Sequence, residues 1–302
     1  MSFPNVRITD PHAAPASPLS KVKAYVELTK PRIIELLLIT TVPAMVVAQG
    51  GWPSTWLVGA TLIGGTLSAG GANAINNVLD RDIDQVMRRT KGRPLPSNRI
   101  APKPALLFGA ILGLGGFLWL WATANLLAAV LSTSGLLFYV FIYTMILKRS
   151  TVQNIVVGGA AGSVPALVGW AAVTDELHVA AWVMFAIIFF WTPPHFWALA
   201  LRYEDDYAVA GVPMLPVVVG KMRTLEQIEL YTLVLVGVSL LLYPTGAVDW
   251  IYLVSAIGLG VWLYRAARRL HRRPGESMRF FGFSNLYLAA LFIMMAVDAL
   301  VL

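Results

Sequence analysis

An apolar segment of the chain ends in the stretch NNVLDRDID, residues 76–84. In a helix, Asn76, Asp80 and Asp84 lie four residues apart, and each step of four overshoots one turn by roughly 40°. The three side chains therefore share one face and form a column of oxygen donors about 12 Å tall. Because Mg²⁺ takes oxygen ligands and is usually shared with substrate phosphates, the stretch predicts a metal–diphosphate site at a membrane surface. The alternative is a solvated helix end, but carboxylates near hydrocarbon are costly and usually serve a function.

Basic side chains follow these donors in the same loop. Lysine and arginine here can neutralise the remaining charge of a bound diphosphate, although any cytoplasmic loop of a membrane protein carries the same residue types. Two prolines, Pro94 and Pro96, predict an ordered turn rather than a helix. Asp82 lies about 200° round the helix from Asp80 and is expected to pair with a base or cap a turn. The candidate phosphate contacts of this loop are Arg88, Arg89, Lys91 and Arg93.

The composition of the chain indicates an all-α, polytopic membrane protein. Of its 302 residues, 57% are hydrophobic and only 13% are charged, which is unlike a soluble domain. Nine apolar runs approach the length of a transmembrane helix, and the shorter ones must extend into their flanks. The nine runs are Ile33–Val47, Trp56–Ala74, Pro104–Trp121, Leu126–Ile146, Ile155–Val173, Val179–Leu201, Ile228–Tyr243, Trp250–Tyr264 and Leu286–Leu302.

Charge divides the loops between these runs into two sets. All 23 Lys and Arg residues lie in one set or at its helix edges, and the opposite loops contain none. The positive-inside rule places the basic set in the cytoplasm, so nine spans put the N-terminus in the cytoplasm and the C-terminus in the periplasm. We therefore predict a polar cytoplasmic tail over residues 1–24 and a nine-helix transmembrane domain over residues 25–302.

The net charge of +7 is one-sided and so indicates anionic lipid head groups and an anionic substrate rather than a nucleic acid. Residues 1–20 lack the apolar core of a signal peptide and are too poor in arginine for a mitochondrial transit peptide, so a bacterial inner membrane is expected. The absence of cysteine excludes disulfides, thiolate catalysis and thiolate metal sites.

A second charged loop follows the sixth apolar run and opens with acidic residues. Glu204, Asp205 and Asp206 could hold a second metal opposite the first, or they could balance local positive charge. Arg202 and Lys221, in the same loop, are further candidate phosphate contacts.

Several other polar residues lie near the ends of the predicted spans. His195 follows the pair Pro193-Pro194, which is expected to break the helix and open a polar pocket. A lone histidine there is a substrate contact or is simply hydrogen-bonded. Lys148 and Arg149 are ordinary positive-inside residues or reach a phosphate from a neighbouring helix. Asn154 lies just inside the fifth span and is expected to line the cavity.

Two carboxylates and two groups of small residues lie inside the predicted spans. Glu35 and Asp298 are each near a helix end, which favours an interfacial position over a catalytic one. The small-residue face at Gly64, Gly70 and Gly71 and its neighbours, together with residues 113–116, predicts close approach between membrane helices.

The motifs together resemble the UbiA superfamily of intramembrane prenyltransferases. The Asn-x3-Asp-x3-Asp element of Asn76, Asp80 and Asp84 marks the superfamily. Four other stretches are similar to those of its haem-farnesylating members. They are LTKPR at 28–32, MRRT at 87–90 running on to RPLP at 93–96, NIVVGGAAG at 154–162, and WTPPHFW at 191–197 leading to GVPMLP at 211–216. The resemblance extends from about residue 25 to the last span.

The resemblance implies nine helices around a central cavity, in which Asn76, Asp80 and Asp84 hold Mg²⁺ and the head group of farnesyl diphosphate. The implied acceptor is a vinyl group of haem B, and the product is haem O. Lys30 or Arg32 would steady a phosphate or a haem propionate. The bilayer is an implied partner, and haem A synthase or terminal oxidase assembly proteins are candidate protein partners.

One departure and two alternatives accompany this resemblance. Many relatives carry a second Asp-x3-Asp element, where this chain has His195 and then YEDD at 203–206. The chain could instead be a sister prenyltransferase that acts on an aromatic acid or a quinone precursor. A haem or lipid carrier without chemistry is the alternative of another class. Carriers of this kind often place broken helices at the bilayer midplane, whereas the charged motifs here lie at the cytoplasmic ends.

Overall fold

The computed structural model describes residues 18–301, and the side chains of residues 18 and 32–38 lie outside the description. The described chain is helical, with no β-strand between residues 18 and 301. The long helices are α2 (Pro31–Gln49), α3 (Thr55–Leu79), α5 (Pro102–Thr123), α6 (Leu126–Leu137), α8 (Asn154–Thr174), α9 (Val179–Arg202), α11 (Leu215–Leu240), α12 (Trp250–Arg272) and α13 (Ser277–Val301). A π-helix, η1 (Phe138–Leu147), and the short α7 (Lys148–Ser150) continue α6 to residue 150.

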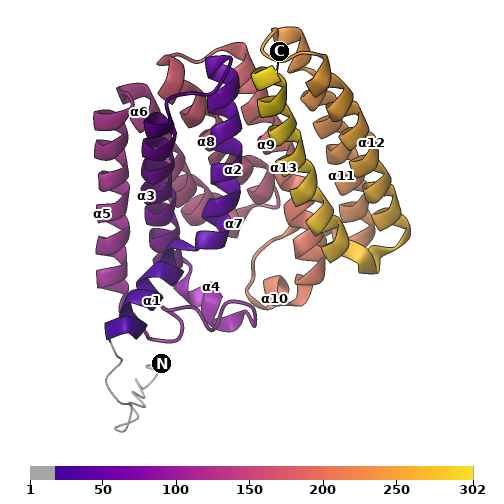
Figure 1. Cartoon of the computed structure of the whole chain (residues 1–302). Helices are drawn as coiled ribbons and strands as arrows, with labels where there is room; N and C mark the ends of the chain where they lie inside the picture. The colour runs from indigo at the N-terminus through magenta and orange to yellow at the C-terminus, as the bar shows by residue number, and fades with distance from the viewer. Residues whose placement is uncertain (1–17, 302) are drawn as a thin grey trace, which may run out of the picture.

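Short helices lie together at one end of the bundle (Figure 1). They are α1 (Pro18–Thr29), α4 (Arg81–Val86) and α10 (Glu204–Val209). Residues 1–17 of the predicted N-terminal tail lie outside the described residues, and α1 already covers positions 18–24. Two 3₁₀ turns, η2 (Tyr243–Thr245) and η3 (Pro274–Glu276), complete the set. The polar ends of the long helices and the short helices therefore meet on one face.

Seven helical segments within the described chain are long and apolar enough to cross a membrane. They are Pro102–Thr123, Leu126–Ser150, Asn154–Thr174, Val179–Arg202, Leu215–Thr245, Trp250–Arg272 and Pro274–Val301. The protein is thus a multi-pass membrane protein. The α3 helix does not belong to this set, because its glycines and asparagines lower its hydropathy. In α2, whose side chains are described from Ile39 onward, Ile39–Gln49 is a shorter apolar stretch.

The long helices pack side by side in a circuit. From α3 it passes through α5, α6, α8 and α9 to α11, α12 and α13, and α13 returns to α2, which contacts α3. The largest buried apolar cluster lies among α8, α9, α11, α12 and α13 and includes Trp191, Tyr252 and Phe292. Small residues line the contact between α3 and α5, whereas large apolar side chains fill the contacts among α8, α9, α11, α12 and α13.

The predicted break at Pro193-Pro194 is wrong. The α9 helix runs from Val179 to Arg202 without interruption and contains both prolines. Both residues are buried against neighbouring helices, and proline is tolerated inside membrane helices when such packing offsets the missing hydrogen bonds.

The small-residue face of α3 allows the backbone of α5 to approach closely. A Cβ atom added to Gly71 would lie 2.6 Å from the carbonyl oxygen of Gly109 and 2.8 Å from the backbone nitrogen of Gly113. The prediction that this face permits close approach is confirmed, since only glycine fits between the two backbones here.

We expect Gly71→Ala to destabilise the protein by about 1–3 kcal/mol, because the added methyl group forces α3 and α5 apart. Gly65→Ala on the same helix is the matched control, since a Cβ there would meet nothing within 4 Å. Thermal unfolding in detergent compares the two variants. Equal unfolding temperatures would show that the helices tolerate separation.

Asp298, one of the two carboxylates inside predicted spans, holds the start of α12. It is 1% exposed, and its two carboxylate oxygens accept from the backbone N–H groups of Asp249 and Tyr252, the latter at 2.9 Å. A carboxylate suits this place because the unpaired N–H groups of a helix N-terminus attract negative charge. Its role is therefore structural.

Asp298→Asn is expected to lower stability by about 1–3 kcal/mol, because the new NH₂ group faces one of the two backbone donors and leaves it unsatisfied. The control is Asp175→Asn, the same substitution at an exposed residue whose left-handed backbone (φ 54°) suits asparagine. If the unfolding temperature of Asp298→Asn matches that of the control, the capping role is refuted.

Candidate active site

The predicted oxygen donors lie at the junction of α3 and α4. The α3 helix ends at Leu79, and Asp80 separates it from α4. The helical hydrogen bonds nevertheless continue, from the Asp80 N–H to the Asn76 carbonyl (2.9 Å) and from the Asp84 N–H to the Asp80 carbonyl (2.8 Å). Asn76, Asp80 and Asp84 are all buried, at 2%, 0% and 2% exposure. Their four-residue register therefore survives the change of helix.

Within the described chain, three cationic side chains hydrogen-bond to the three donors, and each comes from a different segment. Lys30 donates to Asn76 Oδ1 at 2.7 Å. Lys148 forms a short ion pair with Asp80 Oδ2, and Arg93 Nη1 donates to both carboxylate oxygens of Asp84, at 2.8 and 3.0 Å. The structure thus brings together Lys30, Arg93 and Lys148, three of the predicted phosphate contacts, around the donor set.

Positive charge is crowded at this site. Lys30 lies in the turn between α1 and α2, with a left-handed backbone (φ 54°). Burial, together with the neighbouring Arg93 and Lys148, lowers the pKa of Lys30 to about 7 against the opposing effect of Asp80 and Asp84. Such crowding of cations is relieved by a bound anion, which is the electrostatic setting that a diphosphate requires.

A residue that the sequence did not single out completes the network. Thr144, 1% exposed, accepts a hydrogen bond from Asn76 Nδ2 at 3.0 Å and donates to the Tyr139 carbonyl at 2.8 Å. The five-residue step of that second bond follows the π-helix η1, a rare form that is often found at functional sites. The π-helical geometry of η1 therefore determines that Thr144 faces Asn76.

The donor chemistry fits a magnesium ion. No group of three or more His, Cys, Asp or Glu side chains that could hold a metal occurs among the described residues, and the set here differs in that one of its three members is the amide of Asn76. One carboxylate oxygen, Asp80 Oδ1, is buried and has no hydrogen-bond partner. An amide and two carboxylates are hard oxygen ligands of the kind that Mg²⁺ accepts, and the orphaned oxygen is available to such an ion.

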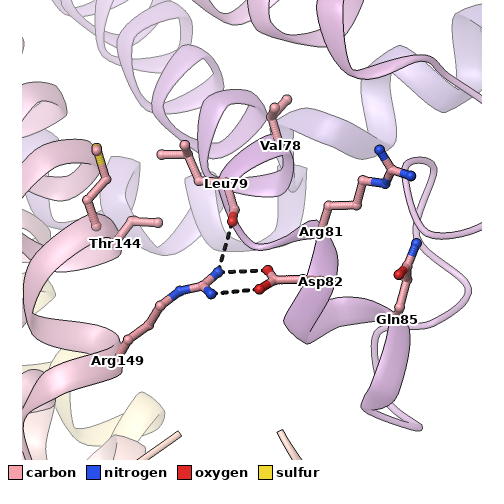
Figure 2. Close-up of a pocket in the computed structure, with 8 residues that line it drawn as sticks. Val78, Leu79, Arg81, Asp82, Gln85, Thr144 and Arg149 are labelled. Carbon is pink, nitrogen blue, oxygen red and sulfur yellow. Dashed lines mark hydrogen bonds and ion pairs between the residues drawn. The ribbon is translucent and has the colours of Figure 1, made fainter. Parts of the chain in front are cut away.

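An open hollow of about 570 Å³ is lined by Leu79, Asp82, Thr144 and Arg149, among others (Figure 2). Arg149 crosses it and makes two hydrogen bonds of 2.7 Å with the carboxylate of Asp82 and one of 2.9 Å with the Leu79 carbonyl. The prediction that Asp82 pairs with a base is confirmed, and the hydrogen bonds from Arg149 lower the pKa of Asp82 to about 2. Arg149 also lies 3.8 Å from Asp80 Oδ1, so it links the hollow to the donor set.

Only one acidic residue of the second loop faces the first loop. Asp206, 8% exposed, accepts from the Arg89 N–H at 3.1 Å and pairs with Arg88 at 3.6 Å. Asp205 is exposed, with no hydrogen bond or ion pair among the described residues. Glu204 pairs with Lys221 at 3.2 Å. The three predicted acids of the second loop therefore have different surroundings. Asp206 joins the two charged loops, Glu204 pairs with Lys221 of α11, and Asp205 is exposed.

The remaining basic candidates lie around this contact. The Arg89 guanidinium lies 5.6 Å from the ring centre of Tyr203 and donates to the Tyr207 hydroxyl at 3.5 Å, and burial raises the pKa of Tyr207. Arg202 lies 6.0 Å from the Tyr203 ring centre, and Lys91 is exposed. The side chain of Arg32 lies outside the described residues.

His195 and Asn154 are buried at separate places. The His195 ring lies between the rings of Trp191 and Phe281, with centroids 4.2 and 4.1 Å away, and its Nδ1 is 2.8 Å from the Ser284 hydroxyl. Asn154 is fully buried and donates to two carbonyls, one of them Pro213 at 3.3 Å, while its Oδ1 has no partner. Neither residue is hydrogen-bonded to the three donors.

Comparison with known proteins identifies the family of this chain. The UbiA prenyltransferase family matches residues 37–293. Two relatives are protoheme IX farnesyltransferase 2 of Saccharopolyspora erythraea, 53% identical over 93% of this chain and 88% of its own, and protoheme IX farnesyltransferase of Gloeobacter violaceus, 55% identical over 92% of both chains.

Solved structures share the fold at low sequence identity. A digeranylgeranylglyceryl phosphate synthase superposes with a TM-score of 0.76 at 20% identity, over 93% of this chain and 99% of its own. A UbiA homologue from Archaeoglobus fulgidus bound to DMAPP and Mg²⁺ superposes with a TM-score of 0.65 at 16% identity, over 90% and 99%. In view of the matched residues and the near-complete coverage, this chain belongs to the UbiA prenyltransferase family.

Proposed function

We propose that this chain transfers the farnesyl group of farnesyl diphosphate to a vinyl group of haem B, with addition of water, to give haem O. The observation that carries the proposal is the buried set of Asn76, Asp80 and Asp84 surrounded by Lys30, Arg93 and Lys148. The choice of haem B rests on the relatives named protoheme IX farnesyltransferase, which match nearly the whole chain at about half identity.

The proposed membrane arrangement has nine spans around a central cavity over residues 25–302. Two further helices, α2 and α3, are 19 and 25 residues long, which is long enough to cross or nearly cross the hydrocarbon core at 1.5 Å per residue. Added to the seven apolar spans, they make nine. The charge sorting of the loops then supports a bacterial inner membrane, with the N-terminus in the cytoplasm and the C-terminus in the periplasm.

Asn76, Asp80 and Asp84 would hold Mg²⁺, and the A. fulgidus homologue bound to DMAPP and Mg²⁺ supports this assignment. The ion would supply Lewis-acid stabilisation of the leaving diphosphate. Lys30, Arg93 and Lys148 bind the remaining phosphate charge, and because they are already fixed in place, they stabilise the departing group without reorganisation. Asp206, Arg88 and Arg89 close the loops over it.

The proposed reaction breaks the allylic C–O bond, and its electron pair leaves with diphosphate. A carbon of the haem vinyl group donates its π electrons to the farnesyl carbon and forms the new C–C bond. Water then adds to the resulting cation and loses a proton, which leaves a hydroxyl group. An apolar wall of the membrane cavity would exclude water from the first cation. His195 and Asn154 are the candidate contacts for the acceptor side.

A product assay tests the proposal. The protein in lipid nanodiscs is incubated with haem B, farnesyl diphosphate and Mg²⁺, and the haem fraction is analysed by mass spectrometry. The expected product carries one farnesyl group and one hydroxyl group. Consumption of an aromatic acid or a quinone precursor in place of haem would favour the sister prenyltransferase, and haem binding without diphosphate release would favour a carrier. Haem A synthase or terminal oxidase assembly proteins are the proposed partners for the product.

A further inference from the structure

A second basic surface lies across the bundle from the candidate active site. Five residues at the C-terminal end of α12 line a groove of about 620 Å³, which we call the arginine groove. They are Arg265, Arg268, Arg269, Arg272 and Arg273. Figure 1 shows this end of α12 at the same end of the bundle as α1, α4 and α10, but at the edge opposite α3 and α5.

The positive charge of the arginine groove is only partly neutralised. Glu229 pairs with Arg268 at 3.0 Å, and Glu276 pairs with Arg273 at 3.4 Å. Three other arginines of the groove have no acidic partner within the described chain: Arg265, Arg269 and Arg272. The groove therefore retains an uncompensated charge that a bound anion would neutralise.

The same face of α12 is apolar towards the middle of the helix. Val254, Ile257 and Val261 are 63%, 48% and 46% exposed, and they precede Arg265 and Arg269 at steps of three or four residues. Residues at these steps share one helix face. One face of α12 thus carries exposed aliphatic side chains followed by arginines. This arrangement is complementary to a molecule with hydrocarbon chains and an anionic head group.

Every basic residue after Arg223 is arginine, apart from His271, and no lysine occurs there. Cytoplasmic location alone is satisfied by either residue type. Arginine differs from lysine in its planar fork, which binds phosphate oxygens in pairs. The choice of residue therefore favours recognition of phosphate over a general basic flank.

We propose that the arginine groove binds the phosphate of an anionic phospholipid from the surrounding leaflet, with its acyl chains along Val254, Ile257 and Val261. The site is separate from the donor set and does not depend on the identity of the prenyl acceptor. It fixes α12 and α13 at the edge of the bundle that lies farthest from α3 and α5.

The test compares phosphatidylglycerol with phosphatidylcholine of the same acyl chains, added to the delipidated full-length protein in neutral detergent. Bound lipid is counted by native mass spectrometry, and thermal unfolding is followed in parallel. We expect phosphatidylglycerol to bind at least about tenfold more tightly and to raise the unfolding temperature. The triple variant Arg265→Gln/Arg269→Gln/Arg272→Gln is expected to lose this preference.

The matched control is Lys21→Gln/Lys23→Gln/Lys103→Gln, which removes three exposed charges elsewhere and should keep the preference. Arg269→Lys retains charge without the fork and should weaken binding less than Arg269→Gln. Equal binding of the two lipids, or full binding by the triple arginine variant, would overturn the proposal. Competition by inorganic phosphate as strong as by phosphatidylglycerol would also overturn it, since it would assign the groove to a soluble anion.

Discussion

Asp80→Asn is expected to lower Mg²⁺-dependent diphosphate release by about a thousandfold. Asp80 is fully buried, its Oδ2 pairs with Lys148, and its Oδ1 is the orphaned oxygen available to a metal. The substitution keeps the shape of the side chain but removes its charge, so the site loses affinity for the ion. The measurement is release of diphosphate from farnesyl diphosphate at several Mg²⁺ concentrations.

Asp175→Asn serves again as the control for this substitution, because it makes the same chemical change at an exposed position. Loss of folding is separated from loss of function by Asp80→Asn/Lys148→Met, which also removes the ammonium left without its partner. The double variant should recover any loss in unfolding temperature, and only its stability is compared, because Lys148 is itself a proposed phosphate contact. If Asp80→Asn retains more than a tenth of the wild-type rate, the donor set is not the metal site.

Asp206→Asn is expected to reduce kcat/KM by about a hundredfold, whereas Asp205→Asn should stay within about threefold of the wild type. The two residues are neighbours in α10, but Asp206 is buried against Arg89 and Arg88, and Asp205 is exposed. Neutralising Asp206 removes the contact that joins the two charged loops. Steady-state kinetics with farnesyl diphosphate and haem B measure both variants under identical conditions.

The half-saturating Mg²⁺ concentration adds a second readout for these two variants. It should rise for Asp206→Asn if this carboxylate supports metal or diphosphate binding, and it should not change for Asp205→Asn. A larger effect at Asp205 than at Asp206 would reverse the assignment of the second-loop acid.

The sequence predicted the parts of the site that depend on local spacing. The register of Asn76, Asp80 and Asp84 follows from helical geometry and is retained although the helix changes at Asp80. The close approach of α3 also follows from local composition, since Gly71 leaves room for the backbone of α5.

Contacts between distant segments could not be predicted in the same way. Lys30 is 46 residues from Asn76, and Thr144 is 68 residues from it. The π-helix that orients Thr144 has no signal in an apolar run, because its extra residue per turn arises from packing rather than composition. Which of Asp205 and Asp206 faces the first loop depends on how α10 is rotated about its axis. The continuity of α9 depends on neighbouring helices that pack against Pro193 and Pro194.

The partners of the donor set all come from an early part of the chain. Each described side chain that contacts Asn76, Asp80 or Asp84 belongs to residues 30–149 of the 302. During synthesis, every member of this network has therefore been added to the chain before the ribosome reaches the midpoint of the protein. The buried carboxylates can find their cations as they enter the bilayer, which spares them the large cost of an unpaired charge while the later helices are still being made.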